Sequence, residues 1–421
     1  MTDRLRIVVT GLIAQHPRLG GVAWDYVQYP LGLADLGHDV FYLEDSGEWP
    51  YNLGASPGSR TAHDPTPNVR HLAGVMERFG FGDRWMYRFP VADRWYGLSD
   101  GRRAEVLASA DLLVDVSGTL EHPERYRHVP RLVYIDSDPV FTQAKLLDDG
   151  TGKYSRWLDV HDVFLSFGER ISDGAFATRH GWRPTRQPVV LAQWRRGAPA
   201  GDALTTVMSW TSYPPMAALG LTLGQKDVAF RPFLDLPARS PIPLEIALGS
   251  EHHEVWETPE AGFGGLLSGA VRADRPLTPD ALLRGKGWRV VDAFARCETL
   301  DSYRSYIEGS LGEWSVAKSG YVVGESGWFS CRSACYLASG RPVVVQDTGF
   351  GAAIPTGVGV LAFSTPGQAL EAISEVAGAY EKHARAAHEV AVEYFDSRKV
   401  LPRMLQDAFA APATAGAEAG P

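Results

Sequence analysis

Short apolar runs alternate with amphipathic stretches along most of the chain, and this alternation predicts an α/β fold. The first run, Leu5 to Val9, is β-branched and ends near a glycine, which is typical of a buried parallel strand. Apolar residues then recur at helical spacing from Val22 to Leu36, and Pro30 predicts a kink or a break in that helix. Val40 to Leu43 predicts the next strand, so the chain opens with a strand–helix–strand unit.

The same alternation continues and then restarts in the second half of the chain. Further strands are expected at Leu112–Val116, Leu132–Ile135, Val163–Phe167, Leu204–Trp210, Leu244–Leu248, Arg289–Val291 and Pro342–Gln346. Helices are expected at Tyr303–Gly309, Phe329–Ala338, Leu370–Tyr380 and His383–Phe395, and a strand or turn at Gly320–Val323. In open α/β sheets the ligand crevice lies beyond the carboxyl ends of the strands, so Asp115, Asp136 and Asp138 are candidates to face a site.

Length and patterning together predict two domains. The chain has 421 residues, and single domains seldom grow beyond about 250 to 300 residues. The polar, small-residue stretch from Trp194 to Ala203 is typical of a linker. We therefore expect an N-terminal Rossmann-like domain at 1–195, a C-terminal one at 204–395, a helix at 396–411 that crosses back to the first domain, and a disordered tail at 412–421.

Composition narrows the classes of function and the compartment. The net charge of −9 argues against nonspecific binding of nucleic acid, which requires a basic surface. The chain has only three cysteines, Cys297, Cys331 and Cys335, which favours a reducing cytoplasm over a disulfide framework, and no metal site is predicted from them. We see no secretory signal and no apolar run long enough to span a bilayer.

The segment from Trp314 to Gly351 carries the most chemical information. A Ser/Gly-rich turn precedes a helix that begins near Phe329, with Ser330, Arg332 and Ser333 in its first turn. A helix N-terminus presents free N–H groups and a partial positive charge, so it can hold a diphosphate. A later glycine-containing loop, Asp347-Thr348-Gly349, follows the next strand, and the two loops could grip a nucleotide sugar.

Within this segment, Ala338-Ser339-Gly340-Arg341-Pro342-Val343-Val344 resembles the donor-site segment A-x-G-x-P-V-V of GT-B glycosyltransferases. The chain up to about Phe409 is also similar to a group of actinobacterial glycosyltransferases, through GGVAWDYVQYPLGLADLGHDVFYLED, GQKDVAF and GWFSCRSACYLASGRPVVVQDTGF. The resemblance implies two Rossmann-like domains that face a central cleft, an N-terminal acceptor domain and a C-terminal donor domain. One departure stands out, because Cys335 occupies the position of a glutamate that binds the donor in many retaining members. The stereochemical outcome therefore stays open.

The resemblance also implies candidate catalytic residues. In inverting members a histidine after the first strand is the base, oriented by an aspartate at a later strand end, and His16 and Asp115 match those positions. His16 could instead only shape the loop before Pro17. Asp25, one turn into the first helix, is a rival base, although acidic residues are also common near helix starts.

Candidate donor-binding residues surround the predicted cleft. Each has a simpler structural explanation: glycines form tight turns, aromatic side chains pack cores, lone lysines are solvated and polar loop residues turn the chain. The candidates are Gly20, Gly21, Trp210, Lys226, Lys318, Ser330, Arg332, Ser333, Asp347, Thr348 and Gly349.

The function expected from these residues is transfer of a sugar from a nucleotide-activated donor to a hydroxyl or amine of a small-molecule acceptor, in natural-product biosynthesis. No cofactor or metal is expected, and the partners are the donor and acceptor, without nucleic acid or a membrane span. A homodimer is left open. Alternatives are a nucleotide-sugar epimerase of the same fold and a noncatalytic nucleotide- or sugar-binding protein. A dinucleotide-dependent oxidoreductase is disfavoured, because no G-x-G-x-x-G follows the first strand and Glu44 and Asp45 alone are weak signals.

Overall fold

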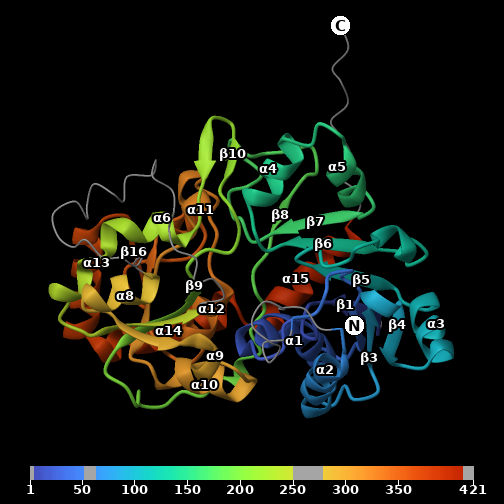
Figure 1. Cartoon of the computed structure of the whole chain (residues 1–421), viewed down its shortest axis with the longest axis horizontal. Coiled ribbons are helices and arrows are strands. Elements are labelled where there is room, and N and C mark those ends of the chain that lie inside the picture. Colours follow the sequence, from blue (N-terminus) through green and yellow to red (C-terminus); the bar gives the residue numbers. More distant parts are fainter. Residues whose placement is uncertain (1–3, 52–62, 250–277, 411–421) are drawn as a thin grey trace, which may run out of the picture.

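The computed structural model describes residues 4–51, 63–249 and 278–410, which form two α/β domains lying side by side (Figure 1). The N-terminal domain is built on a sheet of order β4-β3-β2-β1-β5-β6-β7-β8, parallel except for β4. Its strands are β1 Arg6–Thr10, β2 Asp39–Glu44, β3 Trp85–Phe89, β4 Arg94–Gly97, β5 Leu112–Val116, β6 Leu132–Asp136, β7 Val163–Ser166 and β8 Arg183–Pro184. Its helices are α1 Gly20–Asp35, α2 Thr66–Arg78, α3 Asp100–Ala108, α4 Phe141–Leu147 and α5 Lys153–Leu158.

The C-terminal domain has a parallel sheet of order β13-β12-β9-β14-β15-β16, which is the Rossmann arrangement. The strands of this domain are β9 Leu204–Ser209, β10 Met216–Ala218, β11 Leu221–Leu223, β12 Leu244–Gly249, β13 Arg289–Asp292, β14 Gly312–Ser315, β15 Val343–Gln346 and β16 Val360–Phe363, of which β10 and β11 form a separate hairpin. The helices are α6 Lys226–Phe230, α8 Pro279–Gly285, α9 Ala293–Arg296, α10 Leu300–Gly309, α11 Ser319–Val323, α12 Cys331–Ala338, α13 Pro366–Gly378, α14 Tyr380–Tyr394 and α15 Ser397–Phe409.

The last described helix, α15, returns to the N-terminal domain and packs on α1 (Figure 1). Gly32 of α1 leaves no room for a larger residue, because a Cβ there would lie 2.6 Å from a methyl group of Leu401. Arg183 Nη1 of β8 donates a hydrogen bond to the carbonyl oxygen of Asp407 (3.0 Å). The predicted α/β class with two Rossmann-like domains and a crossing C-terminal helix is therefore confirmed, whereas the predicted tail at 412–421 lies outside the described residues.

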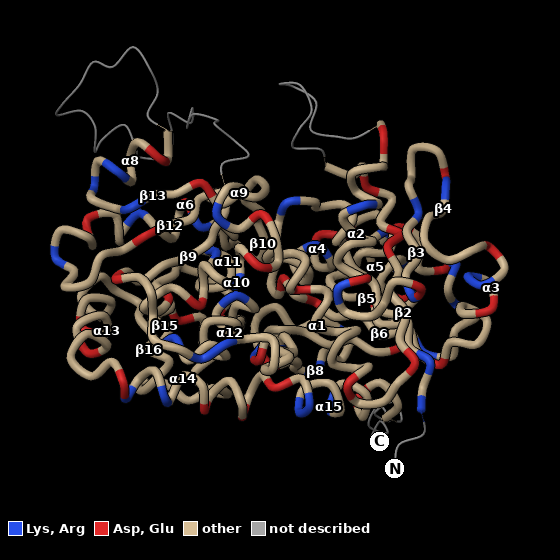
Figure 2. Tube along the Cα trace, turned by 90° about the horizontal axis from the view of Figure 1, so that it is seen from below, with Lys and Arg blue, Asp and Glu red and all other residues tan. Residues whose placement is uncertain are grey.

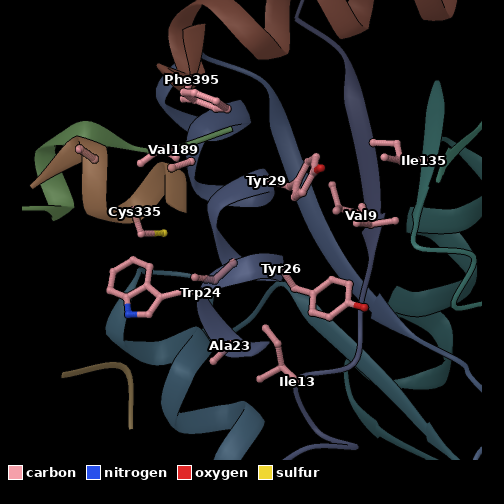
Figure 3. Close-up of a cluster of buried hydrophobic side chains, with 14 of the residues drawn as sticks. Val9, Ile13, Ala23, Trp24, Tyr26, Tyr29, Ile135, Val189, Cys335 and Phe395 are labelled. Carbon is pink, nitrogen blue, oxygen red and sulfur yellow. The ribbon is translucent and has the colours of Figure 1, made fainter. Parts of the chain in front are cut away.

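A shared apolar core joins the two domains. One cluster of buried side chains contains residues of both sheets and of α1 and α12. Figure 3 shows Trp24 of α1 and Cys335 of α12 pointing into this region, with Val189 and Phe395 beside them. Trp24 Nε1 also donates to the carbonyl oxygen of Leu300 in α10 (2.9 Å). Because these contacts bury apolar surface from both domains, they fix the mutual orientation of the two sheets in this structure.

Two details of the predicted elements were wrong. Residues 320–323 belong to the short helix α11, and the strand of this region is β14, which precedes it. The pattern concealed β14 because it contains Glu313, a carboxylate with no exposed side-chain area that forms an ion pair with Arg332. Of the kink or break predicted at Pro30, the break does not occur, because α1 continues through this residue.

Charged residues of both signs are interspersed along both domains (Figure 2). Among the helices of the described residues, none combines the length and apolar character needed to cross a membrane.

Candidate active site

A cavity of about 460 Å³ lies where the two domains meet, and residues from both domains line it. The N-terminal domain contributes the loop after β1 and the first turns of α1, and the C-terminal domain contributes the end of β9 and the starts of α6 and α12. Of the predicted site residues, His16, Gly21, Asp25, Trp210, Lys226, Lys318, Ser330 and Arg332 line this cavity. The structure therefore brings candidates that are as much as about 300 positions apart in sequence into one cleft.

The N-terminus of α12 faces the cavity without a side-chain cap. Ser330 stands at the cap position in extended backbone, and its side chain accepts no capping hydrogen bond. Ser333, in the first turn, is 1% exposed, and its Oγ has no hydrogen-bond partner among the described residues. Free N–H groups and the helix dipole at such a terminus attract an anion, and a hydroxyl without a partner can add a further donor.

Arg332 places a guanidinium at the same point, held rigidly by the second sheet. Its Nε donates to Glu313 Oε1 (2.6 Å), and its Nη atoms donate to the carbonyl oxygen of Val207 and to Ser315 Oγ (both 2.7 Å). Burial opposes its charge, but the neighbouring carboxylate of Glu313 nevertheless raises the pKa of Arg332. A guanidinium has five N–H donors, so two remain for a ligand once these three are used.

Two lysines complete a cluster of cations around the cavity. Burial, followed by repulsion from Arg332 and Lys318, lowers the pKa of Lys226 well below its usual value. Within the described ranges Lys226 forms no ion pair, whereas Lys318 Nζ lies 2.9 Å from Asp138 Oδ1 and 2.9 Å from the hydroxyl of Tyr213. A partly buried ammonium that lacks a counterion is unfavourable unless an anion binds beside it.

Asp25 is the carboxylate that faces these cations from the opposite domain. Burial raises the pKa of Asp25 to about 6, and a hydrogen bond with Cys331 together with the charge of Arg332 limits the rise. At neutral pH the group is therefore ionised and still basic enough to accept a proton. The thiol comes from the first turn of α12, so a group of the C-terminal domain contacts Asp25.

The predicted pair of His16 and Asp115 is not formed. His16 stacks on Tyr51, with ring centroids 4.9 Å apart, and burial lowers its pKa to about 4. Asp115 is fully buried, accepts hydrogen bonds from Thr10 Oγ1 (3.0 Å) and the Thr119 amide (2.7 Å), and lies 3.2 Å from His161 Nε2. Asp115 thus satisfies a cluster inside its own domain instead of orienting a base in the cleft.

The paired glycines serve a close contact between the domains. A Cβ at Gly20 would lie 2.1 Å from the carbonyl oxygen of Thr299, and one at Gly21 would lie 2.9 Å from the ring of Tyr303. The Gly20 amide donates to the carbonyl oxygen of Cys297 (2.9 Å). Both positions therefore require glycine for a close approach, as predicted. The group approached is not a ligand, however, but the backbone of Thr299 and the ring of Tyr303 in the second domain.

The loop after β15 is occupied by internal contacts. Asp347 Oδ1 accepts from the Gly349 amide (2.8 Å), and Thr348 Oγ1 donates to the carbonyl oxygen of Trp328 (2.6 Å). None of these loop residues lines the interdomain cavity. The loop's polar groups turn and anchor the chain, and the role of Asp347, Thr348 and Gly349 in donor binding stays a prediction.

The surroundings of Cys335 explain why no glutamate stands at this position. Cys335 is 1% exposed and lies against α1, where Gln28 Nε2 approaches its sulfur at 4.0 Å. A glutamate at 335 would place a charge in the interdomain core, which is costly without a partner.

A second cavity, of about 580 Å³, adjoins the first at the ends of β9, β12 and β13. Both cavities are lined by Ser209, Trp210 and Gly249, so the two form one continuous groove. Trp210 is 7% exposed and packs on Phe230 with ring centroids 5.4 Å apart, which makes it a wall of the groove. Sequence reasoning missed Asp280 and Asp292 on the far side, because α8 and the start of α9 carry no recognisable motif.

Comparisons with known proteins identify the class of fold to which the two sheets belong. No family model matches the sequence, and no curated protein matches it. The structure, however, is similar to solved glycosyltransferases over nearly its whole length.

Three of these similar structures illustrate the match. An α-glucosyltransferase in complex with UDP and a 13-mer DNA has a TM-score of 0.56 at 11% identity, covering 96% of this chain and 98% of that chain. Sucrose-phosphate synthase from Thermosynechococcus elongatus has a TM-score of 0.52 at 11% identity, covering 96% and 98%. HepE from Anabaena, in complex with UDP-glucose, has a TM-score of 0.51 at 11% identity, covering 96% and 99%. At this identity the likeness establishes the GT-B fold, and membership of the actinobacterial group stays a prediction.

Proposed function

We propose that this protein is a glycosyltransferase that moves a sugar from a nucleotide-diphosphate donor to an acceptor. The observation that carries the proposal is the cleft itself, where Asp25 faces the uncapped N-terminus of α12, Arg332 and the amine of Lys226, which has no ion-pair partner among the described residues. A diphosphate supplies the anion that this cluster lacks. The similar structures that contain UDP or UDP-glucose support a donor of this chemical kind.

The proposed chemistry assigns a role to each side of the cleft. The acceptor oxygen or nitrogen forms a bond to the anomeric carbon, the bond from that carbon to the diphosphate breaks, and Asp25 receives the acceptor proton. Lys226, Arg332 and the α12 amides offset the charge that develops on the leaving diphosphate. Asp25 is preferred to His16 as the base, because a pKa of about 6 suits proton transfer at neutral pH better than one of about 4.

The groove at the ends of β12 and β13 is suited to the nucleoside part of the donor. Leu248, Val290 and Val291 offer apolar surface, and Asp280 and Asp292 offer carboxylates that can accept hydrogen bonds from ribose hydroxyls. These carboxylates would take over the contact with the donor that a glutamate at position 335 makes in many retaining members.

The finer expectations are part of the same proposal. The acceptor is expected to be a small molecule of natural-product biosynthesis, and the compartment is expected to be the cytoplasm. One similar structure contains DNA, so a nucleic acid acceptor is an alternative, which the net charge of −9 disfavours. Within the described residues no three His, Cys, Asp or Glu side chains are grouped to hold a metal ion, and independence from metal stays a prediction.

The test is a thermal-shift and calorimetric panel of nucleoside diphosphates, nucleotide sugars and a dinucleotide, with and without EDTA. A ligand that binds the native state raises the melting temperature, and we expect one nucleoside diphosphate to do so. NMR of the matching nucleotide sugar then separates slow hydrolysis at the anomeric carbon from epimerisation of the sugar ring. Exposed Glu371 on α13, changed to Gln, provides a control outside the cleft. Binding of a dinucleotide alone, or of no nucleotide at all, would contradict the proposal.

A further inference from the structure

Exposed apolar side chains gather around the hairpin formed by β10 and β11. Among the described residues eight large apolar side chains are exposed, and five of them belong to this hairpin or to helices near it. Helix α4 contacts β10, α11 contacts β11, and α6 contacts α11. The five therefore lie on one connected set of elements, and they are Leu147 of α4, Leu219 and Leu221 of the hairpin, Val228 of α6 and Val323 of α11.

The hairpin is held by one of its faces only. Met216 and Leu223, which pair across the two strands, pack in an apolar cluster with residues of α4 and α11. The next pair, Ala217 and Thr222, is exposed. Figure 1 shows the hairpin projecting at the top of the molecule, beside α4 and above α11. The packed face fixes the hairpin in place, so the other face and the tip are presented to the surroundings.

The tip of the hairpin holds an apolar side chain in an unfavourable backbone conformation. Leu219 and Gly220 form the two-residue turn, and their φ angles are positive, at 52° and 75°. Asparagine and glycine are the residues that favour such a turn, whereas leucine rarely adopts a positive φ. Leu219 is also 55% exposed. Leucine at this position is thus unfavourable both in its backbone and in its exposure, which indicates that the tip has a partner outside the described fold.

The hairpin and the chain that flanks it carry no charge. Residues 211–225 contain no Asp, Glu, Lys, Arg or His, in a chain whose net charge is −9. Elsewhere, charged residues of both signs are interspersed along the two domains (Figure 2). The exposed charges beside the apolar side chains are of mixed sign, with Lys145 and Asp148 next to Leu147 and Glu325 next to Val323. This surface therefore suits an apolar partner and offers no basic cluster to an anionic one.

The size and shape of this surface favour a lipid bilayer over another protein. Five partly exposed Leu and Val side chains present on the order of a few hundred Å², whereas a specific protein interface buries about 800 Å² on each partner. Strands of three residues, each with a helix against it, offer little backbone for pairing with a strand of another chain. A projecting apolar tip, by contrast, needs no complementary pocket in a fluid bilayer, where apolar side chains bind by insertion at the interface.

We propose that this hairpin docks the protein on the surface of a lipid bilayer by inserting Leu219 and Leu221 among the lipids. The lipids are zwitterionic, because no basic cluster accompanies the apolar tip to bind anionic headgroups. The chain leaves the wall of the transfer cleft at Ser212 and returns to it at Gln225, so a docked hairpin holds that wall beside the membrane. The inference goes beyond the proposed transferase function and does not depend on it.

The experiment is flotation of the full chain with phosphatidylcholine vesicles, at low and high salt and with phosphatidylglycerol added. We expect binding to phosphatidylcholine that changes little with salt, because apolar insertion is not screened. Leu219→Asn should weaken this binding about five- to tenfold, since insertion buries the exposed half of a leucine side chain. The melting temperature should stay equal or rise, because asparagine adopts a positive φ more readily. Val91→Asn, at a 41% exposed position of the N-terminal domain, is the matched control and should bind like the wild type.

Each outcome decides for or against docking by the hairpin. Absence of flotation with phosphatidylcholine overturns the inference, as does binding that Leu219→Asn leaves unchanged or that Val91→Asn weakens equally. Binding that needs phosphatidylglycerol and disappears at high salt overturns it too, because the contact is then electrostatic. Light scattering of the protein without vesicles adds a further check, since a dimer that Leu219→Asn dissociates would make a second copy the occupant. Calorimetry with nucleotides tests the transferase function separately, so either proposal can fail while the other stands.

Discussion

Two buried polar clusters lie near the carboxyl ends of the strands, and they differ in how completely their groups are satisfied. In the N-terminal domain, Asp115 accepts hydrogen bonds from Thr10 and Thr119 and lies against His161, with both side chains of the Asp–His pair at 0% exposure. In the cleft, Lys226 forms no ion pair within the described residues, and Ser333 Oγ, buried in the first turn of α12 behind the cleft wall, has no partner there either. A satisfied cluster stabilises the fold, whereas an unsatisfied one is stabilised by a ligand. The difference separates structural from functional candidates that look alike in sequence.

The largest expected effect follows from changing Asp25, the base that we propose. Asp25→Asn should lower kcat/KM by about 10²- to 10⁴-fold, the usual contribution of a general base, with the nucleotide Kd preserved. In the wild type, activity should fall as the pH drops through about 6, because protonated Asp25 cannot accept a proton. The checks are a kcat/KM profile against pH and calorimetry of both proteins.

Stability provides the control for this substitution. The folded-state pKa of Asp25 lies above its unfolded value, so stability from this group is present at low pH and is lost as pH rises through about 6. Asparagine resembles the protonated form, so Asp25→Asn should leave the melting temperature at pH 7 equal or higher. A large fall in melting temperature together with the loss of activity would contradict a purely catalytic role.

A smaller effect is expected from changing Lys226, whose amine forms no ion pair in the part of the chain that the structure describes. Lys226→Met should weaken nucleoside diphosphate binding about 10- to 100-fold, because a charge-assisted hydrogen bond is lost. The ligand-free variant should not be destabilised. The folded state lowers the pKa of Lys226, so the charged form of this side chain is unfavourable in the native protein, and methionine removes that cost. Calorimetry with the diphosphate, and urea unfolding without it, measure the two effects. Lower stability of the ligand-free variant would show that Lys226 has a structural partner.

The satisfied cluster should respond in the opposite way. Asp115→Asn should lower the free energy of unfolding by about 1 to 3 kcal/mol, because hydrogen bonds to a buried carboxylate are disturbed. The nucleotide Kd should stay unchanged, since Asp115 does not line the cleft. Urea unfolding and nucleotide calorimetry check this pair of results. A loss of nucleotide affinity at full stability would restore Asp115 as a site residue.

The smallest effect on chemistry is expected at His16. His16→Phe preserves the ring contact with Tyr51 and should change kcat by less than about tenfold, below the usual contribution of a general base. The pH profile should keep its fall near 6. A larger loss, with the profile shifted, would return the role of base to His16.

Local signals in the sequence identified much of the fold and part of the site. Apolar runs located β1, β5 and β9, and the resemblance around Ala338–Val344 indicated the donor-side helix and strand. Ser330 and Arg332 were identified because a helix start can be located from sequence, and the free N–H groups at a helix start can hold an anion. By contrast, β14 was missed, since its buried charge interrupts the apolar pattern that signals a strand.

What the sequence by itself determined is the class of fold, the two α/β halves and the helix start at Ser330, because each depends on neighbouring residues. Only the tertiary structure decided which candidates meet. In the tertiary structure Asp25 lies opposite Arg332, Asp115 pairs with His161, and Gly20 packs against the backbone of Thr299. It also buried Cys335 where a glutamate was expected. The physical reason is that a pKa, a missing partner or a close approach depends on groups hundreds of residues away, which no local pattern encodes.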